Sequence, residues 1–440
     1  MKRNIMEQLI TWKNDPSRKP LLLYGARQVG KTYSLKTFAN QSYKDHVYLN
    51  FEDNPVLKKY FEDSLNPNDI IFKLSIHFNK PILPHSTLII FDEVQECPSA
   101  LISLKCFNED ANDYHICACG SLLGVKIGQQ EGFPVGKVNF RHLFPLSFLE
   151  FLDAINETRL KEYITSITTI APLPEPFHSK LNQLLRIYYY TGGMPEAVLT
   201  YVNQQDFNAV RIVHKDILKS YDLDFSKHAA KHLSLKISEI WNSIPSQLAK
   251  ENKKFVYSLV RTGARAREYE EAIQWLHAAG LVYKIYNIST PKIPLKAYYH
   301  LDFFKIYLID VGLLNTISEL PIKTLLDGEK LFQEFRGALT ENYVFQALAP
   351  LFDNQYYWTS QGIAKIDCII QREGEIIPLE VKSNTSIKSK SLKVYNEKYH
   401  PNLNIRTSML NLKQDGNILN VPLYLLGEIN QILARCNKIS

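Results

Sequence analysis

The sequence has few cysteines, and none of them forms a CxxC pair. Its six cysteines are scattered, and Cys117 and Cys119 share one apolar, strand-like run. This spacing excludes the common zinc and disulfide frameworks and predicts buried thiols in a reducing compartment. No apolar run approaches the roughly 18 residues that a membrane-spanning helix needs, and residues 1–5 lack the apolar core of a signal peptide. We therefore expect a cytoplasmic protein with no membrane segment.

Internal repeats, low-complexity tracts and a strong charge imbalance are also missing. The net charge of the 440 residues is +6, which permits contact with nucleic acid without requiring it. Hydrophobic residues make up 45% and aromatic residues 12% of the chain, enough for sizeable cores. This composition excludes a disordered chain, and the length predicts about two to four domains.

The strongest motif is a phosphate-binding loop. Residues 25–32 match the pattern G-x-x-x-x-G-K-[ST], between an apolar run at 20–24 and a helix-like segment at 33–39. A glycine-rich turn and a helix start direct backbone N–H groups and partial positive charge at one anion. Lys31 would reach the β- and γ-phosphates of ATP, and the hydroxyl of Thr32 would bind Mg²⁺. The residues expected to cradle the nucleotide are Gly25, Ala26, Arg27, Gln28, Val29, Gly30, Lys31 and Thr32.

An apolar strand that ends in two carboxylates supplies the other half of the predicted nucleotide site. The run at 88–91 is followed by Asp92 and Glu93. We expect Asp92 to hold Mg²⁺ and Glu93 to act as general base toward the attacking water. The next apolar run, 115–119, leads to Ser121, which is a candidate sensor of the γ-phosphate. The alternative for Ser121 is a flexible glycine turn.

Two basic residues downstream are candidates for a cation supplied by a neighbouring copy. Arg141 or Lys137 would reach the γ-phosphate in the adjacent subunit of a homo-oligomer. The alternative is that both side chains simply face solvent.

The middle of the chain combines a basic segment with a predicted winged helix. Two helices, at about 252–260 and 266–279, precede two strand-like runs at 281–288 and 295–301, an order typical of a winged helix. Residues 211–267 hold twelve Lys and Arg against five Asp and Glu. Three arginines lie at the start of the second helix, where DNA contacts would be made: Arg261, Arg265 and Arg267. A winged helix that binds protein is the alternative.

A second group of acids lies near the C-terminal end. Glu380 and Lys382 are two residues apart on a strand-like run and therefore share one face, while Asp367 lies on the preceding run. Glu341 lies on the helix before them. This order resembles the PD-(D/E)XK pattern of restriction endonucleases, in which Asp367 and Glu380 would hold a second Mg²⁺. The alternatives are ordinary charged strand faces, or a nuclease-like fold that binds without cleaving.

Taken together, the motifs resemble one known family. The chain is similar to the bacterial and archaeal AAA-family ATPases that carry a C-terminal DUF4143 domain. One departure concerns Lys137, since the family usually has Arg at this position and Lys lacks the forked contact of a guanidinium. The resemblance rests on residues 24–32, 91–95, 120–121, 143–151, 192–196 and 307–314.

The resemblance implies an α/β protein with a P-loop AAA-type parallel sheet core, a helical lid, a winged-helix domain and a C-terminal restriction-endonuclease-like α/β domain. We place these at 1–170, 171–240, 241–328 and 329–440. The expected function is ATP hydrolysis with Mg²⁺ by a DNA-associated protein that contacts DNA through residues 211–267 and carries a nuclease-like C-terminal domain. Two alternatives remain open. One is an ATP-dependent switch or scaffold for protein partners with a degenerate nuclease fold, and the other is a chaperone-like remodeller, for which no pore loop is evident.

Overall fold

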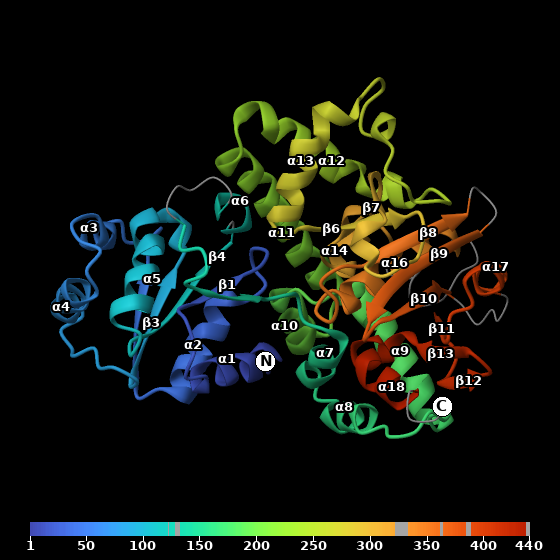
Figure 1. Cartoon of the computed structure of the whole chain (residues 1–440), viewed down its shortest axis with the longest axis horizontal. Helices are drawn as coiled ribbons and strands as arrows, with labels where there is room; N and C mark the ends of the chain where they lie inside the picture. The colour runs from blue at the N-terminus through green and yellow to red at the C-terminus, as the bar shows by residue number, and fades with distance from the viewer. Residues whose placement is uncertain (122, 128–132, 322–332, 361–363, 384–388, 437–440) are drawn as a thin grey trace. The chain divides into compact units, whose positions relative to one another are not determined.

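The computed structural model describes residues 1–121, 123–127, 133–321, 333–360, 364–383 and 389–436. It divides into two compact units, each with its own sheet. Unit 1 comprises Met1–Phe144 together with Ala278–Leu281, and unit 2 comprises Pro145–His277 and Val282–Ser440 (Figure 1). Within the part of the chain that is described, no helix is long and apolar enough to cross a membrane.

Unit 1 is built on a five-stranded parallel sheet, which confirms the predicted α/β core. The strand order is β2-β3-β4-β1-β5, and every neighbouring pair is parallel. β2 and β5 extend the sheet beyond the three strand-like runs predicted at 20–24, 88–91 and 115–119. The strands are β1 (Leu21–Tyr24), β2 (Asp45–Asn50), β3 (Thr87–Asp92), β4 (His115–Gly120) and β5 (Asn139–His142).

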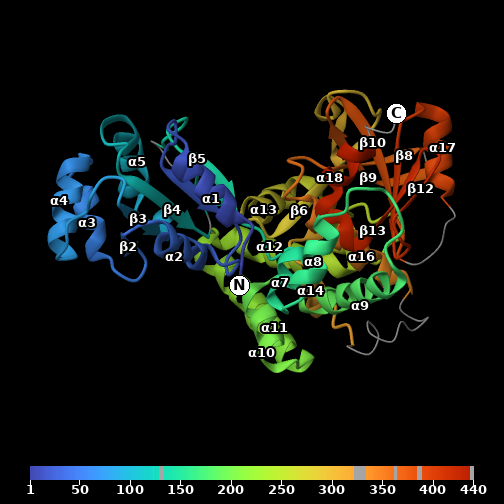
Figure 2. The ribbon, with the colours of Figure 1, turned by 90° about the horizontal axis from the view of Figure 1, so that it is seen from below.

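Helices cover both faces of this sheet (Figures 1 and 2). On one face, α3, α4 and α5 bury a core that includes Phe51, Phe61 and Phe91, whose rings pack edge to face. On the other face lie α1 and α2, so β3 is buried along its whole length, as crossover helices require. The helices are α1 (Ile5–Asn14), α2 (Lys31–Ser42), α3 (Val56–Glu62), α4 (Pro67–His77), α5 (Pro98–Asp110) and α6 (Leu123–Ile127).

Unit 2 contains an eight-stranded mixed sheet in the order β12-β13-β11-β10-β9-β8-β6-β7. The helix α17 (Lys390–Tyr399) packs on one face, where Leu392 and Tyr395 share a core with Trp358. The strands are β6 (Val282–Ile288), β7 (Tyr299–Leu308), β8 (Tyr356–Ser360), β9 (Ala364–Arg372), β10 (Glu375–Val381), β11 (Asn404–Ser408), β12 (Lys413–Asp415) and β13 (Ile418–Pro422).

The remaining helices of unit 2 include the segment predicted to be a helical lid. They are α7 (Phe148–Ala154), α8 (Thr158–Thr165), α9 (Glu175–Thr191), α10 (Pro195–Gln204), α11 (Phe207–His228), α12 (Lys231–Leu248), α13 (Ala266–Ala278), α14 (Val311–Ile317), α16 (Gln333–Leu348), α17 (Lys390–Tyr399) and α18 (Ile429–Cys436). Among them, α9 and α11 both pack against α14.

The structure differs from the predicted winged helix in two ways. The helix expected over 252–260 is only a single 3₁₀ turn at Tyr257–Leu259. The hairpin of β6 and β7 exists, but β6 also pairs in parallel with β8, so the hairpin belongs to the large sheet. This pairing buries Ile288 in one core with Trp358, a long-range contact that local sequence order does not reveal. The predicted boundary at 328/329 lies outside the described residues.

Two motifs that carried the family resemblance meet inside unit 2 and build its framework. Asp310 caps α14 and accepts hydrogen bonds from the backbone N–H groups of Gly193 (2.6 Å), Gly312 (2.9 Å) and Leu313 (3.1 Å), and from Gln346 of α16 (3.2 Å). A Cβ at Gly192 would lie 2.0 Å from the Asp310 carboxylate, so only glycine fits there. These motifs therefore form part of the packing framework of unit 2.

Candidate nucleotide site

The predicted phosphate loop connects β1 to α2 in unit 1. Its backbone has positive φ at Gly25 (+149°), Gln28 (+66°) and Gly30 (+94°), which turns the chain sharply before the helix starts at Lys31. A Cβ at Gly25 would lie 2.2 Å from the carbonyl oxygen of Leu143. Gly25 is thus required because it packs closely on the segment after β5. Gly30 is favoured because its backbone is left-handed.

The side chain of Lys31 lies inside this loop. It is buried, and its ammonium group donates to the carbonyl oxygens of Gly25 (2.9 Å) and Ala26 (2.7 Å). Burial lowers the pKa of Lys31, while Cys119, Glu93 and Asp92 oppose the shift. A buried ammonium that donates to neutral carbonyl groups is well suited to an anion, because phosphate oxygens would neutralise its charge.

Asp92 lies at the tip of β3 and links three strands to the loop. Its Oδ2 accepts from the hydroxyls of Thr32 (2.7 Å) and Tyr48 (2.6 Å). Its Oδ1 lies 3.0 Å from the Cys119 thiol and accepts from the Glu93 N–H at 3.0 Å. The carboxylate and the Thr32 hydroxyl are the oxygen donors that Mg²⁺ prefers, so this donor set fits the ion. Tyr48 and Cys119 were missed by sequence reasoning because they come from β2 and β4.

Glu93 is held beside Asp92 by two polar side chains. Its Oε2 accepts from the Ser121 hydroxyl (3.3 Å) and from the amide of Gln95. Its backbone is left-handed (φ +48°), an uncommon conformation for a residue other than glycine. The structure therefore brings Glu93 and Ser121 together, as expected from neighbouring strand tips. Gln95, three residues after Asp92, is a further partner of Glu93 that the sequence pattern did not predict.

A distant residue supports the loop from behind. The guanidinium of Arg3 donates to the carbonyl oxygens of Val29 (2.9 Å) and Phe144 (2.7 Å), and the side chain is buried. Arg3 thus joins the loop to the end of the segment after β5. Nothing in the first residues of the sequence pointed to this contact.

The two candidates for an inter-subunit cation already have partners within the chain. Lys137 pairs with Glu109 at 2.8 Å, and Arg141 donates to the carbonyl oxygen of Phe140 at 2.8 Å. Both are half-buried. A role toward a neighbouring copy would require each to exchange a weak surface contact for the phosphate.

The acids near the C-terminal end are each paired with lysine. The antiparallel register pairs Leu379 with Cys368, and continuing it sets Glu380 beside Asp367 at the ends of β10 and β9. Asp367 accepts from the Val381 N–H (3.0 Å) and pairs with Lys365 (2.8 Å). Glu380 pairs with Lys382 at 2.8 Å.

Glu341, on α16, is buried among three ammonium groups. It contacts Lys253, Lys305 (3.6 Å) and Lys365 (3.6 Å), and it accepts from the Tyr307 hydroxyl at 2.7 Å. Burial alone would raise the pKa of Glu341, but Lys253, Lys365 and Lys305 together hold this pKa well below its usual range. Burial, reinforced by Lys365, lowers the pKa of Lys305 to about 7.

Glu341 and Asp367 both contact the ammonium group of Lys365, so Glu341 lies near the predicted metal ligand Asp367, and a second Mg²⁺ held by Asp367 and Glu380 stays a prediction. Across the described ranges, no three His, Cys, Asp or Glu side chains are grouped so that they could hold a metal ion. Lysine ammonium groups provide part of the positive charge that these buried carboxylates require. The sequence pattern showed the acids and Lys382, but Lys253 and Lys305, which contact Glu341, come from other elements.

The basic segment 211–267 is divided between structural and exposed residues. Arg211 points inward and donates to the Tyr190 hydroxyl (3.1 Å) and to Asn315 (3.2 Å). The three arginines expected to contact DNA are exposed at the start of α13, but α13 continues with acidic residues that reduce the local positive charge. These are Arg261, Arg265 and Arg267, followed by Glu268, Glu270 and Glu271.

The parallel sheet and the loop geometry define unit 1 as a phosphate-loop nucleotide fold. Residues 17–152 match the family model described as "AAA domain", and residues 336–426 match the domain of unknown function DUF4143. The chain therefore carries an AAA domain followed by a C-terminal DUF4143 domain, which confirms the resemblance drawn from the motifs. Residues 182–324 match a further domain of unknown function, DUF8612. That match crosses the boundary predicted at 240/241, so the four-domain division stays a prediction.

Individual relatives are distant. An uncharacterized protein of Methanocaldococcus jannaschii is 23% identical over 386 residues, covering 85% of this chain and 77% of that protein. A Walker-type ATPase of Pyrococcus abyssi is 13% identical, with a TM-score of 0.45, and the match covers 72% of this chain and 95% of that one. The ORC1 protein of Aeropyrum pernix in complex with DNA is 14% identical, with a TM-score of 0.30, over 74% of this chain and 92% of that one.

Proposed function

We propose that this chain binds and hydrolyses ATP in the presence of Mg²⁺. The observation that carries the proposal is the 2.7 Å hydrogen bond between Thr32 in the phosphate loop and Asp92 at the tip of β3. Two oxygen ligands suited to a metal ion, one from each motif, therefore meet where a phosphate-bound cation would lie. Thr32 and Asp92 would hold the ion, which would supply positive charge to offset that of the phosphates.

The residues of the site have separate roles in phosphate binding and in hydrolysis. The loop N–H groups and Lys31 bind the phosphates, and Lys31 exchanges the Gly25 and Ala26 carbonyls for phosphate oxygens. Glu93 accepts a proton from the attacking water, and Ser121 and Gln95 hold its carboxylate in position. In this assignment Ser121 acts through Glu93 as well as through the γ-phosphate.

Two variants and one control test the proposal. Lys31→Ala should lose both nucleotide binding and turnover, because the loop loses its buried cation. Glu93→Gln should bind ATP normally but turn over about 10²- to 10⁴-fold more slowly, since shape is kept and the base is lost. Lys105→Ala, an exposed lysine on α5, is the matched control. Near-normal turnover by either test variant would reject the assigned site.

A second candidate function is association with DNA, favoured by the exposed Arg261, Arg265 and Arg267. We infer that these side chains contribute phosphate contacts, and that the C-terminal domain binds without cleaving. Replacing all three by Ala should lower the slope of log affinity against log salt by about 0.9 per lost contact with duplex DNA. An unchanged slope would favour the alternative, an ATP-driven switch for protein partners. Cytoplasmic location and a homo-oligomer stay predictions.

A further inference from the structure

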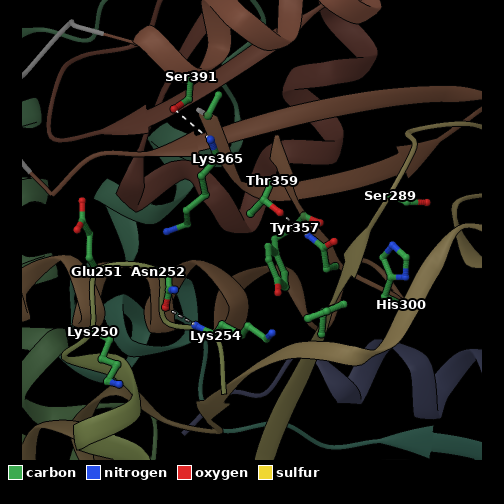
Figure 3. A pocket seen from close by; sticks show the side chains of 13 residues that line it. Lys250, Glu251, Asn252, Lys254, Ser289, His300, Tyr357, Thr359, Lys365 and Ser391 are labelled. Atoms are coloured by element: carbon green, nitrogen blue, oxygen red, sulfur yellow. Dashed lines mark hydrogen bonds between the residues drawn. The ribbon is translucent and has the colours of Figure 1, made fainter. Parts of the chain in front are cut away.

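A cavity of about 990 Å³ opens in unit 2 beside the lysine-paired acids. Its walls come from the segment after α12, from the β6–β7 region and from β8 and β9. Figure 3 shows Lys365 extending from β9 toward the segment that carries Asn252 and Lys254. All of these residues belong to unit 2. We call this cavity the lysine groove, defined by Lys250, Lys254, His300, Phe303, Tyr357 and Lys365.

The charged lining of the lysine groove is mainly basic. Lys250, Lys254 and Lys365 line it, with His300 beside them, whereas Glu251 is the acidic member of the lining. Behind this wall, Lys253 and Lys305 neutralise Glu341, and Lys365 neutralises Asp367. The acids that would repel an anion are therefore already paired, so an anion can enter without a metal ion.

The groove also presents aromatic and hydroxyl groups. Phe303 is 41% exposed, with the Lys254 ammonium 3.7 Å from its ring centre and the His300 ring 5.7 Å away. Ser289, Thr359 and Ser391 add hydroxyl groups to the lining (Figure 3). Exposed rings beside lysines are the combination that binds single-stranded nucleic acid, because bases stack while phosphates meet ammonium groups.

We propose that the lysine groove is a metal-independent site for a single strand of nucleic acid. Lys250 and Lys254 meet successive phosphates, and a base stacks on Phe303. The inference rests on the proposed association with DNA but uses a different surface from Arg261, Arg265 and Arg267. It also explains the paired acids, since a site that binds without a cation has no need of free carboxylates.

The test measures the fluorescence anisotropy of a fluorescein-labelled oligothymidylate as the full-length chain is added. Binding should be equal in EDTA and in Mg²⁺. In the double variant Lys250→Gln/Lys254→Gln, the slope of log affinity against log salt should fall by about 0.7 per lost contact. Phe303→Ala should weaken binding by about fivefold or more, because one base loses the ring on which it stacks. ATP turnover should be unchanged in both variants.

Matched controls separate this site from other basic surfaces. Lys215→Gln/Lys219→Gln removes two exposed lysines from α11 and should leave affinity unchanged. Replacement of Arg261, Arg265 and Arg267 should lower the affinity for duplex DNA more than the affinity for the single strand. A groove variant that binds like wild type while the arginine variant loses all binding overturns the groove and keeps DNA association. A strict requirement for Mg²⁺, or equal affinity for the strand, its duplex and free thymidine monophosphate, also overturns the proposal.

Discussion

At the scale of single residues, the nucleotide site depends on how one carboxylate is held. Asp92 has four hydrogen-bonding neighbours, and two of them, Tyr48 and Cys119, are not part of either nucleotide motif. Burial and the bond to Asp92 both raise the pKa of Tyr48, so this hydroxyl stays a donor at any working pH. Lys36 lies 3.5 Å from the centre of the same ring and fixes it from the side. Tyr48 is therefore a positioning residue for the Mg²⁺ ligand.

Tyr48→Phe should leave ATP affinity near its normal value but raise the Mg²⁺ concentration needed for half-maximal turnover. The variant loses a hydrogen bond to a charged group, worth about 1.5–3 kcal/mol, which corresponds to roughly tenfold or more. Turnover measured over a Mg²⁺ series checks this. Tyr33→Phe, an exposed ring on α2, is the control. An unchanged Mg²⁺ dependence in Tyr48→Phe would show that Thr32 and the backbone of β3 hold Asp92 in position without the Tyr48 hydroxyl.

At the scale of secondary-structure elements, Asp310 joins α9, α14 and α16. Burial raises the pKa of Asp310 to about 6, although four hydrogen bonds favour its charged form. Because this value lies above the unfolded one of 3.8, the folded state holds the proton more tightly. The stability contributed by this group is present below about pH 4 and is lost as the pH rises through about 6.

Asp310→Asn should therefore destabilise unit 2 more at pH 5 than at pH 7. At both values the new amide would face the N–H of Gly193 and the amide of Gln346, at a cost of about 1–3 kcal/mol. The pH-dependent part adds about 1 kcal/mol at pH 5, the linkage expected from the shifted pKa. Urea unfolding at the two pH values measures both terms. Asp206→Asn, an exposed cap on α11, is the comparison, and an equal penalty at both pH values would contradict the raised pKa.

Elements formed by local sequence were predictable, and those fixed by distant pairing were not. The phosphate loop, Asp92 and Glu93 follow from a glycine turn and buried strand ends, which a short window shows. Arg3 supports that loop from 26 residues away, and no periodic pattern marks such a contact. The hairpin of β6 and β7 was foreseen, but its pairing with β8 depends on residues near 356. For the same reason, the partners of Glu341 were hidden, because Lys253, Lys305 and Lys365 are spread over more than a hundred residues.

At the scale of the whole molecule, the two units have separate sheets and separate hydrophobic cores. The proposed nucleotide site lies entirely in unit 1, and Asp310 lies in unit 2. A ligand stabilises only the structure that binds it, by RT ln(1 + [L]/Kd), or about 2.7 kcal/mol at a hundredfold excess over Kd. Nucleotide and the Asp310 substitution should therefore act on different unfolding steps.

Differential scanning calorimetry should resolve two transitions. A non-hydrolysable ATP analogue with Mg²⁺ should raise only one of them, by about 2–4 °C per kcal/mol for a domain of this size. Lys31→Ala should abolish that increase without moving the other transition. Asp310→Asn should lower the temperature of the other transition, the one that nucleotide does not shift. Each transition can then be assigned to its unit. A single transition that rises with nucleotide and falls with Asp310→Asn would mean that the units unfold together, and that the nucleotide loop and the Asp310 framework share one cooperative structure.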